Sequence, residues 1–561
     1  MPEQPTIPQS QHAVQLVGPG ELTLTPDKPV RRPGPRQVLA RIEAVGLCFS
    51  DLKLLKQFSA HGRKGAVASG LDADVLSAIP SYVPDEQPTV SGHEAVCRVV
   101  AVGEGVTCAA VGGRYLIQTD YRWLRTHGSN AAFGYNFEGA LQQYVLMDER
   151  VIVDPDSGEP LLIPVDDAHS ASAICLIEPW ACVEDSYVTA ERQALAPGGT
   201  LLVVAAAGRE VRGLAAAACD GRQASVTAVV ADAAQLDPVT ALDVGVTRAD
   251  SIDALGDATF DDIIYFGADK ATIERLDARL ADGGLLNVVT GGRAVGEPVA
   301  LNVGRAHYGA TRWIGTTGED AAAAYAMIPE TGEIRDDDSI CVVGAGGPMG
   351  QMHVLRNLCS GKANLSVTAS DLDDARLASL GAKAEPLARA AGAELKLLNP
   401  QSTPDETRHS YYAIMAPVPA LVADAVRRAA DGARINVFAG IPPTEPNELD
   451  FDAIVARGVY LFGTSGSVVR DMHIVLDKLN AGRLDTNASV DAVSGMAGAI
   501  DGIHAVENRT LAGKIIVYPA LSDLPLTPLS ALGAALPSVA AKLDDGRWTR
   551  AAEDELLRAA T

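Results

Sequence analysis

Three short motifs in the first third of the chain carry side chains that could bind a metal ion. The segment GLCFSD contains Cys48, GHE contains His93, and IEP contains Glu178. A thiolate, an imidazole and a carboxylate together suit Zn²⁺ with an open coordination position. Each residue also has an ordinary structural explanation: Cys48 as a core residue, His93 as a hydrogen-bonded turn residue, and Glu178 as an acid at a helix start. The sequence predicts a catalytic zinc site if the three segments converge.

A glycine-rich segment, VVGAGGPMG (342–350), lies between a predicted strand and a predicted helix. Glycines let the backbone approach a pyrophosphate, which the helix N-terminus then binds. Its spacing has one residue more than the strict GxGxxG pattern. An acid follows the next strand about 20 residues later, where it accepts hydrogen bonds from ribose hydroxyls and favours NAD over NADP. Because an arginine lies nearby, NADP stays an alternative cofactor. The predicted cofactor-binding residues are Gly344, Gly346, Gly347, Pro348, Met349, Gly350, Asp371 and Arg376.

The elements that must position these residues fall into two patterns. Residues 12 to about 155 read as short strands broken by Gly and Pro, which indicates a β-rich domain. Strands then alternate with Ala-rich helices, and two stretches, 198–318 and 338–466, match each other in order and spacing. Both contain an ADG turn before a strand and end on GT-[ST]-G. We therefore expect two tandem doubly wound domains.

The first of these repeats lacks the glycine turn. Its corresponding segment is AAAGRE (205–210), and the Cβ atoms of the alanines would obstruct a pyrophosphate. Asp232 follows the next strand, so a ribose contact is conceivable. We nevertheless expect no dinucleotide in this repeat, which is better explained as a structural or oligomerisation copy.

The composition excludes several classes of partner. The net charge of -25 repels nucleic acid and anionic lipid. The first residues do not resemble a signal peptide, and no apolar run reaches the roughly 18–20 residues of a membrane span. The eight cysteines are dispersed without any CxxC pair, so we expect reduced thiols in the cytoplasm and no four-cysteine zinc site. We expect a small-molecule substrate and a homo-oligomer, either a dimer or a tetramer.

The segment between the first two motifs, residues 53–91, is basic in an otherwise acidic chain. It contains Lys53, Lys56, His61, Arg63 and Lys64. Cations there could bind the phosphate of a substrate. A solvated surface loop is the alternative, and it is slightly favoured. Lys53, Arg63 and Lys64 are the candidate substrate-binding residues.

The order of these motifs resembles the zinc-type medium-chain dehydrogenase/reductases, and among them the sorbitol dehydrogenase and L-sorbose-1-phosphate reductase-like branch. CFSD is similar to that family's CxSD, SGHEAVCRVVAVGEGV to its GHE strand, and EPWACV to its EPLACV. The resemblance covers roughly residues 12–195 and 335–519, and the first repeat is an insertion relative to the common architecture.

The resemblance implies a role for each matching residue. Cys48 and His93 would be zinc ligands, Glu94 and Glu178 would be ligands that alternate with water or hydrogen-bond to it, and Ser50 would relay the proton. Asp51 would orient a ligand such as His93. Many relatives have His where Lys53 stands, so the outer proton relay differs here. The implied reaction is hydride transfer between NAD(P) and a secondary alcohol of a polyol, sugar or sugar phosphate.

The expected fold class is α/β. A GroES-like β-rich catalytic domain spans 1–190 and is completed by 485–519, a degenerate Rossmann-like repeat spans 191–334, and the NAD(P)-binding Rossmann domain spans 335–484. A helical tail, 520–561, is expected to pack on the body or on another subunit. Two alternatives stay open: a lyase or epimerase that uses NAD transiently, and a non-catalytic nucleotide-sensing scaffold.

Overall fold

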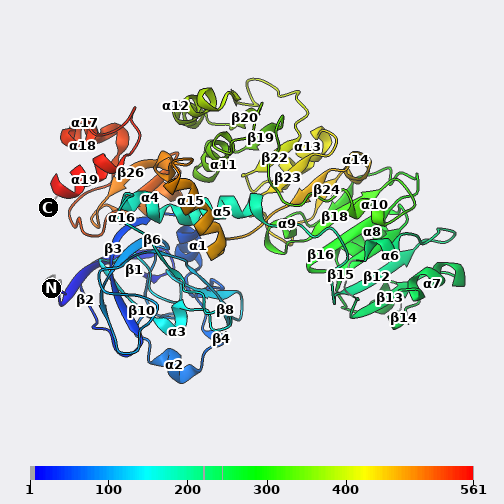
Figure 1. Cartoon of the computed structure of the whole chain (residues 1–561), viewed down its shortest axis with the longest axis horizontal. Coiled ribbons are helices and arrows are strands. Elements are labelled where there is room, and N and C mark those ends of the chain that lie inside the picture. The colour runs from blue at the N-terminus through cyan, green and yellow to red at the C-terminus, as the bar shows by residue number, and fades with distance from the viewer. Residues whose placement is uncertain (1–6, 219–221, 243, 560–561) are drawn as a thin grey trace. The chain divides into compact units, whose positions relative to one another are not determined.

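The computed structural model describes residues 7–218, 222–242 and 244–559. The chain divides into two compact units, one formed by Met1–Cys182 with Ser467–Thr561 and the other by Val183–Gly466. Strands dominate the first unit, whereas the second alternates strands with helices (Figure 1). Among the helices of the described ranges, none has the length and apolar character that crossing a bilayer requires.

The first unit is built around an eight-stranded sheet with the order β11-β7-β6-β3-β27-β26-β28, in which β10 also pairs with β3. Side chains of β3 are buried along almost the whole strand, as its apolar sequence favours. Strand β27, close to the C-terminus, pairs antiparallel with the end of β3. The strands are β3 (Gln37–Gly46), β6 (Glu94–Val102), β7 (Arg114–Ile117), β10 (Tyr144–Asp148), β11 (Leu162–Pro164), β26 (Val490–Ser494), β27 (Lys514–Val517) and β28 (Thr527–Pro528).

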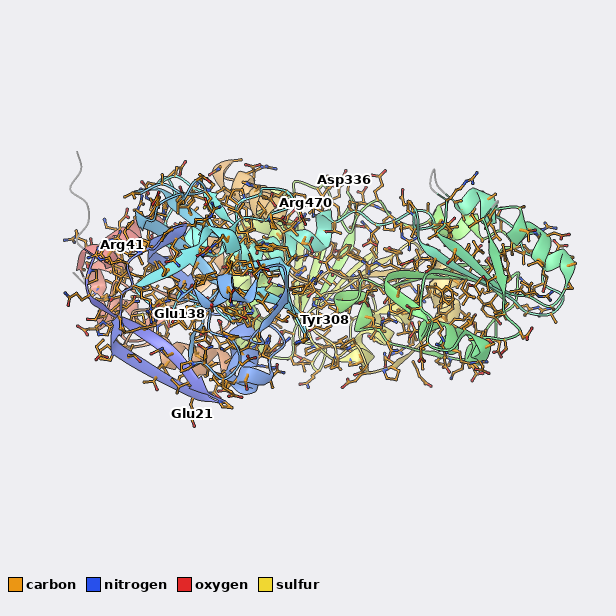
Figure 2. All side chains as sticks on the ribbon, turned by 90° about the horizontal axis from the view of Figure 1, so that it is seen from below. Glu21, Arg41, Glu138, Tyr308, Asp336 and Arg470 are labelled. Atoms are coloured by element: carbon orange, nitrogen blue, oxygen red, sulfur yellow. The ribbon has the colours of Figure 1, made fainter. Side chains whose placement is uncertain are left out.

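The first unit also contains two three-stranded sheets. They have the orders β2-β1-β5 and β4-β8-β9. Glu138, labelled in Figure 2, accepts a hydrogen bond from Lys28 of β2 at 2.9 Å. The basic segment 53–91 contains helices and strands as well as loops. The strands are β1 (Ser10–Gly18), β2 (Glu21–Pro29), β4 (Val67–Ser69), β5 (Thr89–Val90), β8 (Asp120–Thr126) and β9 (Asn130–Ala132), and the helices of the segment are α1 (Phe49–Gln57) and α2 (Ala73–Ser77).

The second unit contains two parallel six-stranded sheets with equivalent strand orders, β14-β13-β12-β15-β16-β18 and β21-β20-β19-β22-β23-β25. This order reverses beside the first strand, as in doubly wound nucleotide-binding folds. The expected α/β class with two tandem repeats is confirmed. The strands are β12 (Thr200–Ala205), β13 (Ser225–Val229), β14 (Val246–Arg248), β15 (Phe260–Phe266), β16 (Leu280–Val289), β18 (Arg312–Thr316), β19 (Ser339–Val343), β20 (Ser366–Ser370), β21 (Glu394–Leu398), β22 (Tyr411–Ile414), β23 (Arg434–Val437) and β25 (Tyr460–Phe462).

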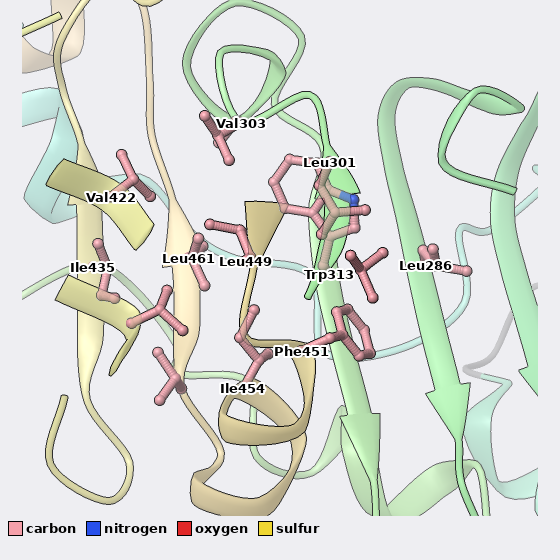
Figure 3. Packing of buried hydrophobic residues seen from close by; sticks show 14 of the residues in the cluster. Leu286, Leu301, Val303, Trp313, Val422, Ile435, Leu449, Phe451, Ile454 and Leu461 are labelled. Atoms are coloured by element: carbon pink, nitrogen blue, oxygen red, sulfur yellow. The ribbon is translucent and has the colours of Figure 1, made fainter. Parts of the chain in front are cut away.

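The two repeats share one hydrophobic core. Strands β17 (Val299–Leu301) and β24 (Asn447–Leu449), one from each repeat, pair antiparallel in a separate two-stranded sheet. Leu301, Trp313, Leu449 and Phe451 are all fully buried in the cluster beside it (Figure 3). Burying these side chains together removes a large apolar area from water, so the repeats form one packed body.

The unit boundaries differ from the sequence-based ones at 183–190, which groups with the second unit, and at 467–484, which groups with the first. Helix α15 (Val469–Asn480) groups with the β-rich unit instead of the second repeat, and the Oδ1 atom of Asn480 lies 2.9 Å from the ring nitrogen Nε2 of His169. The tail packs on the same unit, because the Glu553 carboxylate accepts a hydrogen bond from the Tyr518 hydroxyl at 2.8 Å. The expected helical tail consists of the short helices α17 (Leu532–Ala535) and α18 (Pro537–Ala540), of which the second begins at Pro537, followed by α19 (Arg550–Ala559).

The cysteines of the described residues are free thiols. The prediction of reduced cysteines included Cys219, and the prediction about a signal peptide used residues 1–6. These residues lie outside the part of the chain that the structure describes.

Candidate active site

Cys48 stands directly before helix α1, after the chain leaves central strand β3. Its backbone is extended, and its N–H donates to the Asp51 carboxylate at 3.0 Å. This capping contact fixes the first turn of the helix. The Ser50 hydroxyl lies 3.5 Å from the Cys48 sulfur. Local helix-capping geometry therefore holds the thiol, the hydroxyl and the carboxylate of this motif together.

Asp51 also reaches the second motif. Its Oδ1 atom lies 3.2 Å from Nδ1 of His93 and accepts a hydrogen bond from the Gly92 N–H at 3.3 Å. Burial alone would raise the pKa of Asp51, but the charge of His93 and these hydrogen bonds hold it below its ordinary value. With Nδ1 engaged, Nε2 of His93 is the nitrogen available to a metal.

Glu94 begins strand β6 and is fully buried. Its Oε1 atom forms a close ion pair with Lys514 of β27, whose ammonium also donates to the Leu47 carbonyl at 3.0 Å. Burial alone would lower the pKa of Lys514, but the Glu94 carboxylate raises it above its ordinary value. A Cβ atom on Gly46 would lie 2.2 Å from Oε2 of Glu94, so this close approach requires a glycine.

The structure brings three of the four predicted ligands into one group. Donor atoms of Cys48, His93 and Glu94 all lie within 4.8 Å of one another. The other oxygen of Glu94, Oε2, is buried without a hydrogen-bond partner in the described part of the chain. A buried carboxylate with an unpaired oxygen, on a residue grouped with a thiol and an imidazole, fits a cation.

Glu178 lies near this group without being part of it. Burial raises its pKa to about 7, while the charge of His93 opposes that shift. The Cys182 thiol lies 3.8 Å from its Oε1 atom, one turn further along α5 (Ile177–Val188). The carboxyl is therefore buried and close enough to the donor group to be affected by the charges of His93 and Glu94.

The glycine segment 342–350 forms the turn between β19 and helix α11 (Pro348–Leu358). Gly344 has a φ of 83°, and the N–H of Gly346 donates to the Asp371 carboxylate at 2.8 Å. A Cβ atom on Gly346 would lie 2.7 Å from Cβ of Arg376. Gly347 is the N-cap residue, and Pro348 and Met349 begin the helix. A Cβ on Gly350 would meet the Gly344 carbonyl at 2.2 Å.

The acid and the arginine of the cofactor prediction lie beside this turn, against Gly346. Asp371 follows β20, and Leu372 beside it is 61% exposed, which leaves an apolar surface next to the carboxylate. Arg376, on helix α12 (Asp374–Ala391), lies 3.6 Å from the carboxylate of Asp373. Turn, helix N-terminus and acid therefore occupy the arrangement of a dinucleotide site.

In the first repeat, an arginine side chain occupies the place that corresponds to the glycine turn of the second repeat. Arg209 is buried, and its guanidinium donates to the carbonyls of Val289 at 3.3 Å and Gly291 at 3.5 Å. Asp232 caps helix α7 (Ala233–Thr240) by accepting from the Gln235 N–H at 3.0 Å. The turn is therefore closed by an arginine side chain, and the acid is used as a helix cap.

The three candidate substrate-binding cations lie in different environments. Lys64 is buried and donates to backbone carbonyls, to that of Val83 and to that of Gln87 at 2.9 Å, so it stabilises its own loop. Arg63 forms an ion pair with Asp120 at 2.5 Å and lies over the ring of Tyr135. Lys53 is on helix α1, and its charge contributes to lowering the pKa of His61.

Sequence reasoning missed three residues of this region. Lys514 had a visible signal, a lysine within the apolar segment AGKIIVYP, because a charge in a buried strand requires a partner. Asp120 and Tyr135 have no comparable signal, because their contacts join segments that the sequence does not connect.

A second group of metal-type side chains, Cys341, Asp405 and His409, lies in the second repeat. His409 is already engaged on both sides, since one nitrogen lies 2.8 Å from the Ser339 hydroxyl and the other 2.8 Å from Asp405. Arg428 lies 3.5 Å from the same carboxylate. The hydrogen bonds and the adjacent guanidinium make this a structural cluster.

Comparison with known proteins identifies the β-rich unit. The alcohol dehydrogenase GroES-like domain family matches residues 34–156. Mannitol-1-phosphate 5-dehydrogenase of Aliivibrio fischeri is 26% identical over 356 residues, which cover 58% of this chain and 82% of that protein. Sorbitol dehydrogenase of Sus scrofa is 35% identical over 97 residues, 17% of this chain and 78% of that protein. The crystal structure of 2R,3R-butanediol dehydrogenase from Bacillus subtilis matches 91% of this chain and 100% of its own, with a TM-score of 0.51 and 14% identity.

Proposed function

Because the chain belongs to the medium-chain dehydrogenase/reductases, a family of alcohol dehydrogenase-type oxidoreductases, we propose that it is a zinc-dependent, NAD(P)-linked dehydrogenase. The substrate is a secondary alcohol of a polyol, sugar or sugar phosphate. The observation that carries this proposal is the group formed by Cys48, His93 and Glu94, whose donor atoms lie within 4.8 Å of one another.

The residues of this group fit a zinc ion. A thiolate and an imidazole are preferred zinc ligands, and the orphaned Oε2 of Glu94 is a third donor. When bound, zinc polarises a hydroxyl and lowers its pKa. Glu178, close to the group and with a pKa of about 7, is the fourth proposed ligand or hydrogen-bond partner.

The surrounding residues hold and move protons. Asp51 accepts from the His93 ring and fixes its orientation. Lys514 pairs with one oxygen of Glu94 and leaves the other for the ion. Ser50, beside the Cys48 sulfur, accepts the proton of the substrate hydroxyl and passes it outward.

The glycine turn of the second repeat is the proposed dinucleotide site. Its backbone N–H groups and the α11 N-terminus bind the pyrophosphate, and Asp371 binds the adenosine ribose, which favours NAD over NADP. A dinucleotide held by these residues would supply the hydride acceptor for the oxidation. Arg209 fills the corresponding turn of the first repeat, which supports one cofactor per chain.

Two relatives support the substrate class. The Aliivibrio fischeri and Sus scrofa proteins are named for a polyol phosphate and a polyol. A polyol-type substrate is therefore the proposal for this chain.

The test is reduction of NAD⁺ or NADP⁺ by a panel of polyols, sugars and sugar phosphates. We expect NADH formation with NAD⁺, its loss after chelation, and its recovery when zinc is restored. An epimerase or lyase would convert substrate without net NADH, and a nucleotide sensor would bind NADH without converting any substrate. Either result would overturn the proposal.

A further inference from the structure

We propose that the two repeats of the second unit meet in an internal two-fold interface, so that the first repeat occupies the surface on which a second copy of this fold would dock. The inference does not depend on the proposed reaction. Two-fold symmetry requires that each contact occurs twice, with the roles of the two repeats exchanged. Three contacts between the repeats meet this requirement.

The sequences of the two repeats align without a gap through the segments that touch. EPVAL (297–301) in the first repeat corresponds to EPNEL (445–449) in the second. The GTTG segment (315–318) corresponds in the same alignment to GTSG (463–466). Each residue between these limits therefore has one equivalent in the other repeat, and the contacts of equivalent residues can be compared one by one.

The first contact is the pairing of β17 with β24, which is symmetric about one position. Ala300 lies opposite Glu448, and these two residues are equivalent in the alignment. The pairs on either side are the same contact with the roles of the strands exchanged. They are Val299 with Leu449, and Asn447 with Leu301. A two-fold axis therefore passes between Ala300 and Glu448.

The second contact involves the first glycine of each GT-[ST]-G segment. A Cβ atom on Gly315 would lie 2.7 Å from Cγ2 of Val455 in the second repeat. A Cβ atom on Gly463, the equivalent glycine, would lie 3.1 Å from Cα of His307 in the first repeat. Val455 and His307 are themselves equivalent, so each glycine permits close approach to the same helix of the other repeat. These helices are α9 (Arg305–Tyr308) and α14 (Phe451–Arg457).

The third contact joins the start of each of these helices to a loop of the other repeat. The Asp452 carboxylate accepts hydrogen bonds from the N–H groups of Val295 and Gly296, both at 2.8 Å. Gly304 is the equivalent of Asp452, and a Cβ atom there would collide with the carbonyl oxygen of Ile441. The loop before EPVAL therefore packs on the second repeat as the loop before EPNEL packs on the first.

The face around the two-fold axis is apolar in both repeats. Leu301 and its equivalent Leu449 are fully buried there, as are Trp313 and its equivalent Leu461 (Figure 3). Without the first repeat, the second would expose a contiguous apolar surface, and such surfaces are covered by a partner. The first repeat supplies that cover within the chain. The expected dimer or tetramer must therefore form through another surface.

Disulfide cross-linking of the full chain tests whether this face pairs within one molecule. Ala300→Cys combined with Glu448→Cys places two thiols opposite each other, close enough for a disulfide. We expect mild oxidation to link the two positions within single chains, with the linked peptides identified by mass spectrometry and no gain in mass on a non-reducing gel. Glu448→Cys alone should form no more linked dimer than the collision control Asp282→Cys, where the native side chain is 86% exposed.

The single variant is decisive because Glu448 lies on the axis. If β24 paired with β24 of a second copy, the two introduced thiols would meet, and Glu448→Cys alone would form linked dimers well above the collision control. That result would overturn the internal interface. A double variant that links separate chains to one another, or that forms no disulfide between the two positions while both thiols still react with an alkylating reagent, would also overturn it.

Discussion

At the residue scale, the carboxylate of Asp51 connects the two chain segments that supply the thiol and the imidazole. It accepts hydrogen bonds from the backbone of Cys48 and of Gly92, and it contacts the His93 ring. One side chain thereby fixes the start of α1 relative to the start of β6. A ligand ring oriented in this way loses less conformational entropy when it binds a metal.

Asp51→Asn should weaken zinc binding, because the amide is a poorer acceptor for the His93 N–H. We expect the dissociation constant for zinc to rise about 10–100-fold. Competition with a chromophoric chelator measures this constant. Glu43→Gln, which changes an acid paired with Arg98 on the neighbouring strand, is the control. Unchanged zinc affinity in Asp51→Asn would contradict the orienting role.

The residue types of the metal-binding group could be predicted from sequence because each lies within a short motif. Cys48, Ser50 and Asp51 are brought together by one helical turn. The partner of Glu94 could not be found in this way, since Lys514 is 420 positions away in sequence. The burial of Lys64 and its two hydrogen bonds to backbone carbonyls could not be predicted either, because burial is a property of the folded loop.

At the scale of single elements, the two repeats show what a glycine turn contributes. In the second repeat the turn leaves the α11 N-terminus open, whereas in the first repeat Arg209 occupies the strand ends. The sequence indicated this contrast through the replacement of glycines by AAAGRE. It did not indicate that the arginine would turn inward and bind the carbonyls of Val289 and Gly291.

Gly346→Ala should weaken NADH binding, because the new Cβ would lie 2.7 Å from Cβ of Arg376 and close to Asp371. A steric cost of about 1–3 kcal/mol corresponds to a rise in Kd of roughly five-fold to 150-fold. NADH fluorescence titration gives the constant. Arg209→Ala in the first repeat should leave the Kd and the stoichiometry of one unchanged. A second bound NADH in the wild type would show that the first repeat also binds cofactor.

Helix α11 contains a histidine that should make stability depend on pH. Burial, with the charge of Arg356, lowers the pKa of His353 to about 3 from 6.5. Below pH 6.5 the unfolded chain binds a proton that the folded chain does not. The free energy of unfolding should therefore fall by about 1.4 kcal/mol per pH unit as the pH decreases from 6.5 toward 3.

Urea unfolding of the wild type and His353→Gln across this range measures the contribution. The variant should lose less stability than the wild type on acidification, even if it is less stable at neutral pH. Parallel pH dependences would show that the imidazole is protonated in the folded state.

At the scale of the whole molecule, the first repeat has a clear structural role. It supplies β17 to the pairing with β24, and its Trp313 is buried in the core shared with the second repeat (Figure 3). Glu191 also accepts from Arg312 of the first repeat and from Tyr460 of the second. The duplication could be predicted from the repeated ADG and GT-[ST]-G segments, but the shared core could not, because it depends on which faces meet.

Leu449→Ala should destabilise both repeats together. The side chain is fully buried in the shared core, so its truncation should cost about 2–5 kcal/mol. Hydrogen exchange should show faster exchange in β16 and in β23 by the same factor. Glu448→Gln on the same strand, where the side chain is 67% exposed, should change the free energy by less than about 0.5 kcal/mol. Faster exchange confined to the second repeat would contradict a common core.

The most direct test of the dehydrogenase proposal is the zinc content of the purified chain and of two cysteine variants. Cys48→Ser removes a donor of the proposed catalytic group, and Cys341→Ser removes one from the cluster with Asp405 and His409. We expect one zinc per chain in the wild type and in Cys341→Ser, and almost none, with no NADH formation, in Cys48→Ser. Full zinc content and full activity in Cys48→Ser, or loss of zinc in Cys341→Ser alone, would contradict the assignment of the metal to Cys48, His93 and Glu94.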